Sequence, residues 1–197
     1  MNRTAALLVS VLLMTLSGSS ALAQQMVPMK GMMLDRESLQ NNLVGATAMP
    51  ADRTLELQIV LKVRNKEAFD KLPDEQNDPD SPYYHRQISR EEIARDFGPS
   101  ASDYQAVESW LTSQGLQVVA VDDSFLSRSI RCTGTVAQIE SAFRVQLTQS
   151  GDGQSFANTT EPQIPETLVA LIGYIGGLSN LGASVAGSHH ISPPKSP

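Results

Sequence analysis

The chain has 197 residues and is acidic, with 21 Asp and Glu against 15 Lys and Arg and a formal net charge of -6 at pH 7. An acidic chain without a cluster of basic residues is a poor candidate for binding nucleic acid. Cys132 is the single cysteine, which excludes an internal disulfide, so a hydrophobic core must hold the fold. This length predicts one domain with one core.

The first residues have the pattern of an export signal. Arg3 gives a basic start, an apolar run follows, and Ala21 and Ala23 form the small-x-small pattern of a cleavage site. The apolar run is shorter than the roughly 20 residues that a membrane helix needs. We therefore expect a signal peptide over residues 1–23, cleavage before Gln24, and a periplasmic or secreted protein that no longer contacts the membrane.

Two flanking segments lack a periodic apolar pattern. Residues 24–53 are rich in Met, Asn and Gln, and they predict a flexible N-terminal arm or a lead-in strand. Residues 181–197 end in a proline-rich stretch that contains His189 and His190, which predicts a linker or tail. The folded domain is therefore expected over residues 54–180.

The clearest element is a strand over residues 54–63. Its apolar residues alternate with polar ones and share one face: Leu55, Leu57, Ile59, Leu61 and Val63. A short helix over residues 65–72 is expected to end near Pro73, and two prolines within residues 78–82 predict a turn.

Three later segments begin with residues that cap helices. In each, a Ser or Thr is followed three residues later by a side chain that can complete a capping box: Ser89 with Glu92, Ser100 with Asp103, and Thr135 with Gln138. Gly115 is placed to end the second of these helices in a left-handed turn. Gly151 and Gly153 predict a hairpin turn after the third.

The remaining elements complete an alternating order. Strands are expected over residues 116–121 and 126–133, followed by a short helix over residues 165–171 and a strand over residues 172–175. The order βαββαβ predicts an α+β fold of the ferredoxin-like class with an antiparallel sheet. Its helices would cover one face of the sheet and leave the other face free for a partner.

A series of motifs runs through these segments. The residues that carry it are Pro82, Tyr84, Ser89, Glu92, Phe97, Trp110, Gly115, Gly134, Phe143, Pro165, Gly177, Leu178 and Asn180. Over residues 55–180 the series resembles the activation pro-segment, or pro-kumamolisin-type domain, of the sedolisin and kumamolisin family of serine-carboxyl peptidases. Any single motif is weak evidence, but seven in the same order are specific.

The resemblance implies a ferredoxin-like fold similar to that of subtilisin pro-domains. In the family this domain assists folding of the catalytic domain, masks the active site and is removed on acidification. His85 stands where the family usually has Gly; His tolerates positive φ, and a pH switch is its alternative role. Cys132 lies at a strand position, which predicts a buried structural thiol and not a reactive one.

The sequence contains no complete set of catalytic residues. The family's Gly-Thr-Ser nucleophile motif does not occur in it, so we expect no peptidase activity from this chain by itself. Glu92 and Asp96 are four residues apart, as are the family's catalytic Glu and Asp, but Glu92 belongs to a capping motif. His189 and His190 lack further ligands at metal-binding spacing, and no metal or cofactor is predicted.

These observations predict an exported, non-catalytic pro-segment that binds a sedolisin-type peptidase in trans. The resemblance implies that the exposed sheet face contacts the enzyme, that the tail from Leu181 lies near the active-site cleft, and that acid releases the complex. A second interpretation is the N-terminal fragment of a longer precursor whose catalytic domain is missing in cis. The third is an exported binding module that keeps the fold for adhesion or assembly.

Overall fold

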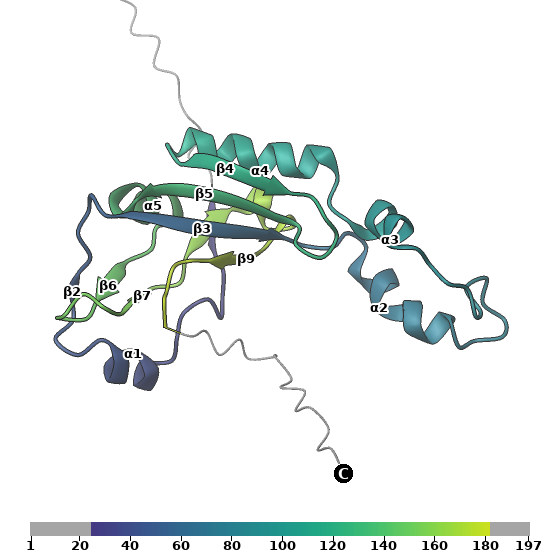
Figure 1. Cartoon of the computed structure of the whole chain (residues 1–197), viewed down its shortest axis with the longest axis horizontal. Helices are drawn as coiled ribbons and strands as arrows, with labels where there is room; N and C mark the ends of the chain where they lie inside the picture. Colours follow the sequence, from purple (N-terminus) through teal and green to yellow (C-terminus); the bar gives the residue numbers. More distant parts are fainter. Residues whose placement is uncertain (1–24, 182–197) are drawn as a thin grey trace, which may run out of the picture.

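The computed structural model describes residues 25–181 (Figure 1). The helices are α1 (Arg36–Asn42), α2 (Lys66–Glu75), α3 (Arg90–Phe97), α4 (Ala101–Ser113), α5 (Val136–Phe143) and the 3-10 turn η1 (Glu166–Leu168). The strands are β1 (Met26–Pro28), β2 (Thr47–Ala48), β3 (Thr54–Leu61), β4 (Gln117–Asp122), β5 (Ser129–Thr135), β6 (Leu147–Gln149), β7 (Phe156–Asn158), β8 (Gln163–Pro165) and β9 (Ile172–Gly176).

A four-stranded antiparallel sheet with strand order β4-β5-β3-β9 forms the centre of the fold. The alternation predicted for β3 is confirmed, because Leu57, Ile59 and Leu61 are at most 1% exposed. Their cross-strand neighbours continue the apolar face, with Cys132 opposite Leu57 and Ile175 opposite Ile59. The predicted α+β class and antiparallel sheet are therefore present.

Helices α4 and α5 supply the side chains that cover this apolar face. The ring of Trp110 in α4 meets that of Phe143 in α5 edge to face, with centroids 5.3 Å apart. Phe143 is fully buried and belongs to the same core cluster as Leu57 and Ile59 of the sheet. One layer of helices thus covers one face of the sheet, as predicted.

The segment expected to be a flexible arm contributes to the domain. Strand β1 pairs with β8, and β2 pairs with β6, both antiparallel. The Glu161 carboxylate accepts hydrogen bonds from the main-chain N–H groups of Gly31 and Met32 at 2.9 and 3.0 Å. Because these strand pairs and hydrogen bonds tie the segment to the rest of the domain, residues 26–48 are not a free arm, and a lead-in strand is present as β1.

The helix ends agree with the sequence except at Pro73. All three predicted capping boxes are present, and Gly115 follows α4 with a φ of +80°. Helix α2 continues beyond Pro73, where we expected it to end. Proline lacks only its own N–H, and the next turn is still closed by Gln76 N, which donates to Leu72 O at 3.0 Å.

Two expectations for the last third of the chain have different outcomes. Where a helix was expected over residues 165–171, only the short 3-10 turn η1 is present. The helix does not continue because Leu171 O accepts a hydrogen bond from Lys62 N at 2.7 Å, and this bond directs the chain into the sheet. The hairpin turn expected at residues 151–153 is confirmed, since β6 and β7 pair with each other on either side of it.

Candidate functional site

The face of the four-stranded sheet opposite the core is exposed and mostly polar. It is formed by the alternate positions of the strands, which point away from α4 and α5. Across the ladder, Glu56 is opposite Thr133, Gln58 is opposite Arg131, and Val60 is opposite Tyr174. We call this surface the open sheet face and define it by Glu56, Gln58, Val60, Arg131, Thr133 and Tyr174.

The polar contacts on the open sheet face are weak ones. Arg131 Nη1 lies 3.7 Å from Glu56 Oε1, and both side chains are more than half exposed. An exposed pair of this kind stabilises a fold by about 0–1 kcal/mol, so it does not hold the sheet together. Gln58 Nε2 donates to Ser129 Oγ at 3.1 Å. The face therefore presents donors and acceptors that another protein can engage without disturbing the core.

The chain turns sharply where it leaves the sheet. Gly177, directly after β9, has a φ of +93°, and a Cβ atom there would lie 2.3 Å from Glu56 O. Leu178 is 3% exposed, and Asn180 Oδ1 accepts a hydrogen bond from Phe156 N at 2.7 Å. The course of the chain up to residue 181 is thus fixed by contacts with β3 and β7.

Helices α2 and α3 extend away from the sheet (Figure 1). Phe69 joins them to the domain, since its ring centroid lies 5.3 Å from that of Phe97 and 5.6 Å from that of Phe125. A groove of about 480 Å³ opens on these two helices and is lined mainly by the apolar side chains of Phe69, Leu72, Pro73, Ile88 and Ile93. The lining also includes Asp70 and Gln76, but it contains no Ser, Thr, Cys or His, so the groove has no hydroxyl or thiol nucleophile beside that carboxylate.

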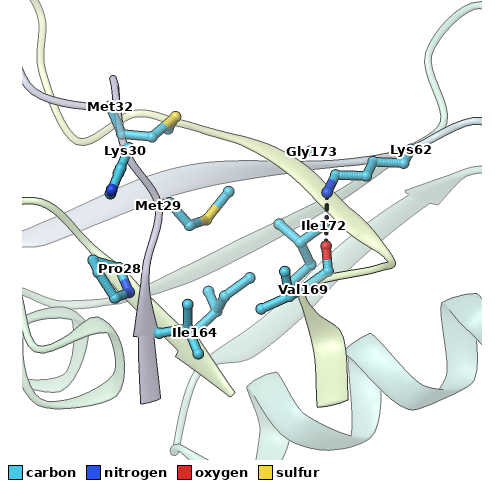
Figure 2. Close-up of a pocket in the computed structure, with 10 residues that line it drawn as sticks. Pro28, Met29, Lys30, Met32, Lys62, Ile164, Val169, Ile172 and Gly173 are labelled. Carbon is cyan, nitrogen blue, oxygen red and sulfur yellow. Dashed lines mark hydrogen bonds between the residues drawn. The ribbon is translucent and has the colours of Figure 1, made fainter. Parts of the chain in front are cut away.

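A smaller cavity of about 210 Å³ lies between β1 and the start of β9 (Figure 2). Met29 and Ile164 are among its apolar lining residues, and Lys62 donates from Nζ to Val169 O at 2.7 Å along one side. Its lining contains no Ser, Thr, Cys, His, Asp or Glu. The cavity therefore lacks both a hydroxyl or thiol nucleophile and a carboxylate or imidazole base.

Glu92 and Asp96 lie one turn apart in α3 but have separate partners. Glu92 Oε2 accepts from Ser89 N at 3.0 Å, and Glu92 Oε1 pairs with Arg86 Nη2 at 2.6 Å. The Ser89 N–H, and after it the Arg86 guanidinium, lower the pKa of Glu92, while a hydrogen bond from Arg95 lowers the pKa of Asp96. Both carboxylates are therefore anionic at neutral pH, which suits a cap and an ion pair and not a general acid.

The cap at Glu92 predicts a stability difference that depends on pH. A carboxyl group whose pKa is lowered by folding stabilises the folded state above its unfolded pKa of about 4.3, and this contribution is lost as the pH falls through the folded value. Glu92→Gln keeps a side-chain acceptor but loses the charge that pairs with Arg86. We expect its urea unfolding midpoint to be lower than that of the parent chain at pH 7 and equal to it at an acid pH below the folded pKa of Glu92.

Glu91→Gln is the matched control for this prediction. Glu91 lies in the same first turn of α3, but within residues 25–181 it has no hydrogen bond to Ser89 and no ion pair with Arg86. Its unfolding midpoint should follow that of the parent chain at both pH values. Equal midpoints for Glu92→Gln and the parent at pH 7 would mean that the cap and the ion pair do not stabilise α3.

Cys132 and His85 lie in very different settings. Cys132 is fully buried in β5, and this burial raises the pKa of its thiol to about 11, which leaves no thiolate at neutral pH. His85 adopts a φ of +51°, and its ring stacks on that of Tyr84 with centroids 4.0 Å apart. His85 N donates to Gln76 O at 3.0 Å, so this turn is tied to the end of α2.

The motif residues are spread over the whole domain. In chain order they lie in the α2–α3 connection (Pro82, Tyr84), in α3 and its cap (Ser89, Glu92, Phe97), in and after α4 (Trp110, Gly115), in β5 and α5 (Gly134, Phe143), at the end of β8 (Pro165) and after β9 (Gly177, Leu178, Asn180). Their surroundings are caps, packing contacts and tight turns. The structure does not bring them together into one cluster.

Several predicted features lie outside the described residues: the cleavage-site residues Ala21, Ala23 and Gln24, and the pair His189–His190. Within residues 25–181, no group of three or more His, Cys, Asp or Glu side chains could hold a metal ion. Over that same range, every helix is too short or too polar to cross a membrane.

Comparison with known proteins gives matches to one peptidase activation domain and to peptidases. Residues 41–181 match the family described as the activation domain of pro-kumamolisin. Sedolisin from Pseudomonas sp. (strain 101) is 25% identical over 135 residues, which are 68% of this chain and 23% of that protein. Xanthomonalisin from Xanthomonas sp. (strain T-22) is 26% identical over 151 residues, 76% of this chain and 18% of that protein. Tripeptidyl-peptidase sed1 from Aspergillus fumigatus is 27% identical over 124 residues, 61% of this chain and 19% of that protein.

These matches confirm the resemblance that the motifs over residues 55–180 indicated. The family match covers well over half of the chain, and it begins at residue 41, upstream of β2, which we had assigned to the arm. The chain spans about a fifth of the length of the curated relatives it matches. The chain therefore belongs to the pro-kumamolisin activation-domain family.

Proposed function

We propose that this chain is a non-catalytic pro-segment that binds and restrains the catalytic domain of a sedolisin-type peptidase. One observation carries the proposal: residues 41–181 match the activation domain of pro-kumamolisin, and the chain is similar to sedolisin and xanthomonalisin. A domain of this family would act by folding against a peptidase and occupying its surface, with hydrolysis left to the peptidase.

The open sheet face is the surface proposed to contact the peptidase. Glu56, Gln58, Arg131 and Tyr174 are exposed on it, and the Glu56–Arg131 pair contributes little to the fold. A partner can therefore compete for these charges at small cost to the domain. The core lies on the other side of the sheet, under α4 and α5, so binding at the open sheet face would leave the packing unchanged.

Acid is proposed to weaken the complex. The chain carries 21 acidic residues, and their ionised forms at neutral pH can pair with basic groups of the peptidase. As the pH falls toward about 4, carboxylates with ordinary pKa values become partly protonated, which weakens such pairs. The cap of α3 would be lost at a still lower pH, because the pKa of Glu92 is lowered and Glu92 stabilises the fold only while it is ionised.

Residues 1–23 are proposed to export the chain, with cleavage before Gln24, so that it meets the peptidase in the periplasm or outside the cell. The peptidase could act in trans, as a separate chain, or follow in cis within a longer precursor. The DNA downstream of the Pro197 codon distinguishes these arrangements. A continuous reading frame that encodes Gly-Thr-Ser would favour the arrangement in cis.

A binding titration tests the proposal. Residues 24–197 would be added at pH 7 to a sedolisin-type catalytic domain that has been separated from its own pro-segment, with calorimetry as the readout. We expect a one-to-one complex with that domain and no heat with a trypsin-like peptidase of similar net charge. Absence of binding to a panel of sedolisin-type catalytic domains would overturn the proposal.

A further inference from the structure

The cavity between β1 and the start of β9 combines apolar walls with a local excess of positive charge (Figure 2). Its lining is apolar except for Lys30 and Lys62, which are both exposed, and it contains no carboxylate. The chain as a whole has a formal net charge of -6, so two lysines without an acidic partner stand out. Such a lining is complementary to an apolar group that ends in an anion.

Lys62 is held along one side of the cavity before any ligand arrives. Its Nζ donates to Val169 O at 2.7 Å, and its main-chain N donates to Leu171 O at 2.7 Å. An ammonium group has three N–H donors, so two are left for the acceptor atoms of a ligand. A side chain that is already placed loses less conformational entropy on binding.

A β-bulge in β9 makes room for the stem of Lys62. The pairing of β3 with β9 shifts between Val60 and Leu61, which leaves Gly173 as an extra residue in β9. A Cβ atom at residue 173 would lie 3.2 Å from Lys62 Cγ, so a side chain there would press on the lysine. Bulges are over-represented beside active sites, where they redirect a side chain.

Lys30 supplies the second positive charge. Within residues 25–181 its side chain has no hydrogen bond and no ion pair. The turn that carries it is fixed, because the Glu161 carboxylate accepts from Gly31 N and Met32 N at 2.9 and 3.0 Å. Glu161 is engaged with these two main-chain groups and does not neutralise Lys30.

The size and polarity of the cavity narrow the ligand. An apolar cavity of about 150 Å³ binds benzene, so this one, at about 210 Å³, has room for a chain of roughly six to eight carbon atoms. The amide N–H groups of a peptide would find no side-chain acceptor in the lining, because a lysine only donates. Burial of such unsatisfied groups is costly, whereas a plain aliphatic chain has none.

We propose that this cavity binds an aliphatic carboxylate of about six to eight carbon atoms. Its chain would lie against Met29 and Ile164, and its carboxylate would accept charge-assisted hydrogen bonds from Lys62, with Lys30 as a second positive charge. The inference does not depend on a peptidase partner.

The first test locates the ligand with the methionine methyl groups as NMR reporters. The purified chain, with isotope-labelled methionine methyl groups, is titrated with sodium octanoate at pH 7. We expect the signals of Met29 and Met32, which line the cavity, to shift, and that of Met49, which is buried elsewhere in the core, to stay. Unchanged Met29 and Met32 signals below the micelle-forming concentration of octanoate, or an equal shift of Met49, would overturn the proposal.

The second test varies the ligand. From butanoate to octanoate, each added CH₂ should strengthen binding about 3- to 4-fold, and the affinity should level off once the cavity is full. 1-Octanol has the same chain without the charge and should bind about 10-fold more weakly than octanoate. An affinity that keeps rising beyond decanoate, or equal binding of octanol, would contradict the proposal.

The third test removes the charge from the protein. Lys62→Met keeps a stem of similar shape without the ammonium group, so octanoate should bind about 10-fold more weakly and octanol as before. Lys71→Met is the matched control, because Lys71 is an exposed lysine that pairs with Glu67 on α2 and does not line the cavity. Octanoate binding that is unchanged in Lys62→Met, or equally weakened in both variants, would overturn the proposal.

Discussion

Gly177→Ala is expected to destabilise the domain by about 3 kcal/mol in urea unfolding. Gly177 has a φ of +93°, a conformation that an alanine adopts only with strain. In addition, its Cβ would lie 2.3 Å from Glu56 O and 3.2 Å from Leu57 Cα. Those atoms belong to the main chain of β3, which cannot move without disturbing the centre of the sheet.

Gly153→Ala is the control that isolates the contact with β3. Gly153 also has a positive φ, of +71°, but a Cβ there has no atom within 4 Å. Only the backbone strain remains, so we expect a loss of about 1 kcal/mol. If Gly177→Ala costs no more than Gly153→Ala, the close approach of residue 177 to β3 is contradicted.

Thr133→Arg is expected to weaken inhibition of a sedolisin-type peptidase by roughly 100-fold or more while leaving the domain folded. Thr133 lies on β5, an inner strand of the open sheet face, with Glu56 opposite it on β3 and Gln117 opposite it on β4. A large side chain there would hold the two proteins apart. The fold should tolerate it, because the new guanidinium faces the Glu56 carboxylate across the strands.

The control places the same kind of side chain on the opposite side of the domain. Ala106 is exposed on α4, so Ala106→Arg adds comparable bulk and charge away from the open sheet face. Both variants should unfold within about 0.5 kcal/mol of the parent chain, and only Thr133→Arg should lose inhibition. Equal inhibition by the two variants would show that the peptidase binds elsewhere.

The long elements could be predicted because their signals are local. The strand β3 alternates over eight residues, and the three capping boxes lie within four residues of chain each. The end of α2 could not be predicted from Pro73. A proline near the end of a helix removes one hydrogen bond, but the next turn can still close, as the bond from Gln76 N to Leu72 O shows.

The short strands could not be predicted, because their pairing is not local. β1, β2, β6, β7 and β8 have two or three residues each, too few to show alternation. The bonds from Gly31 and Met32 to Glu161 join groups about 130 residues apart. Nothing in residues 24–53 alone indicates such partners, so a segment with scattered methionines resembled a free arm.

For the candidate site, too, the sequence predicted the features with local signals and missed the contacts between distant residues. The sequence predicted that one face of the sheet would be free, because helices were expected on one side only. It also identified Asn180 as part of a family motif. It did not reveal the hydrogen bonds of Asn180, since its partners Gln154 and Phe156 lie 26 and 24 residues earlier in the chain. Only the turn between β6 and β7 brings them to the exit of the domain.

Inhibition at two pH values tests the central claim most directly. Residues 24–197 would be titrated into an active sedolisin-type peptidase at pH 7 and at pH 4, with hydrolysis of a short peptide as the readout. The account predicts tight inhibition at pH 7 that weakens markedly at pH 4. A peptidase that hydrolyses the peptide at an unchanged rate at pH 7, whatever the amount of this chain, would contradict the account.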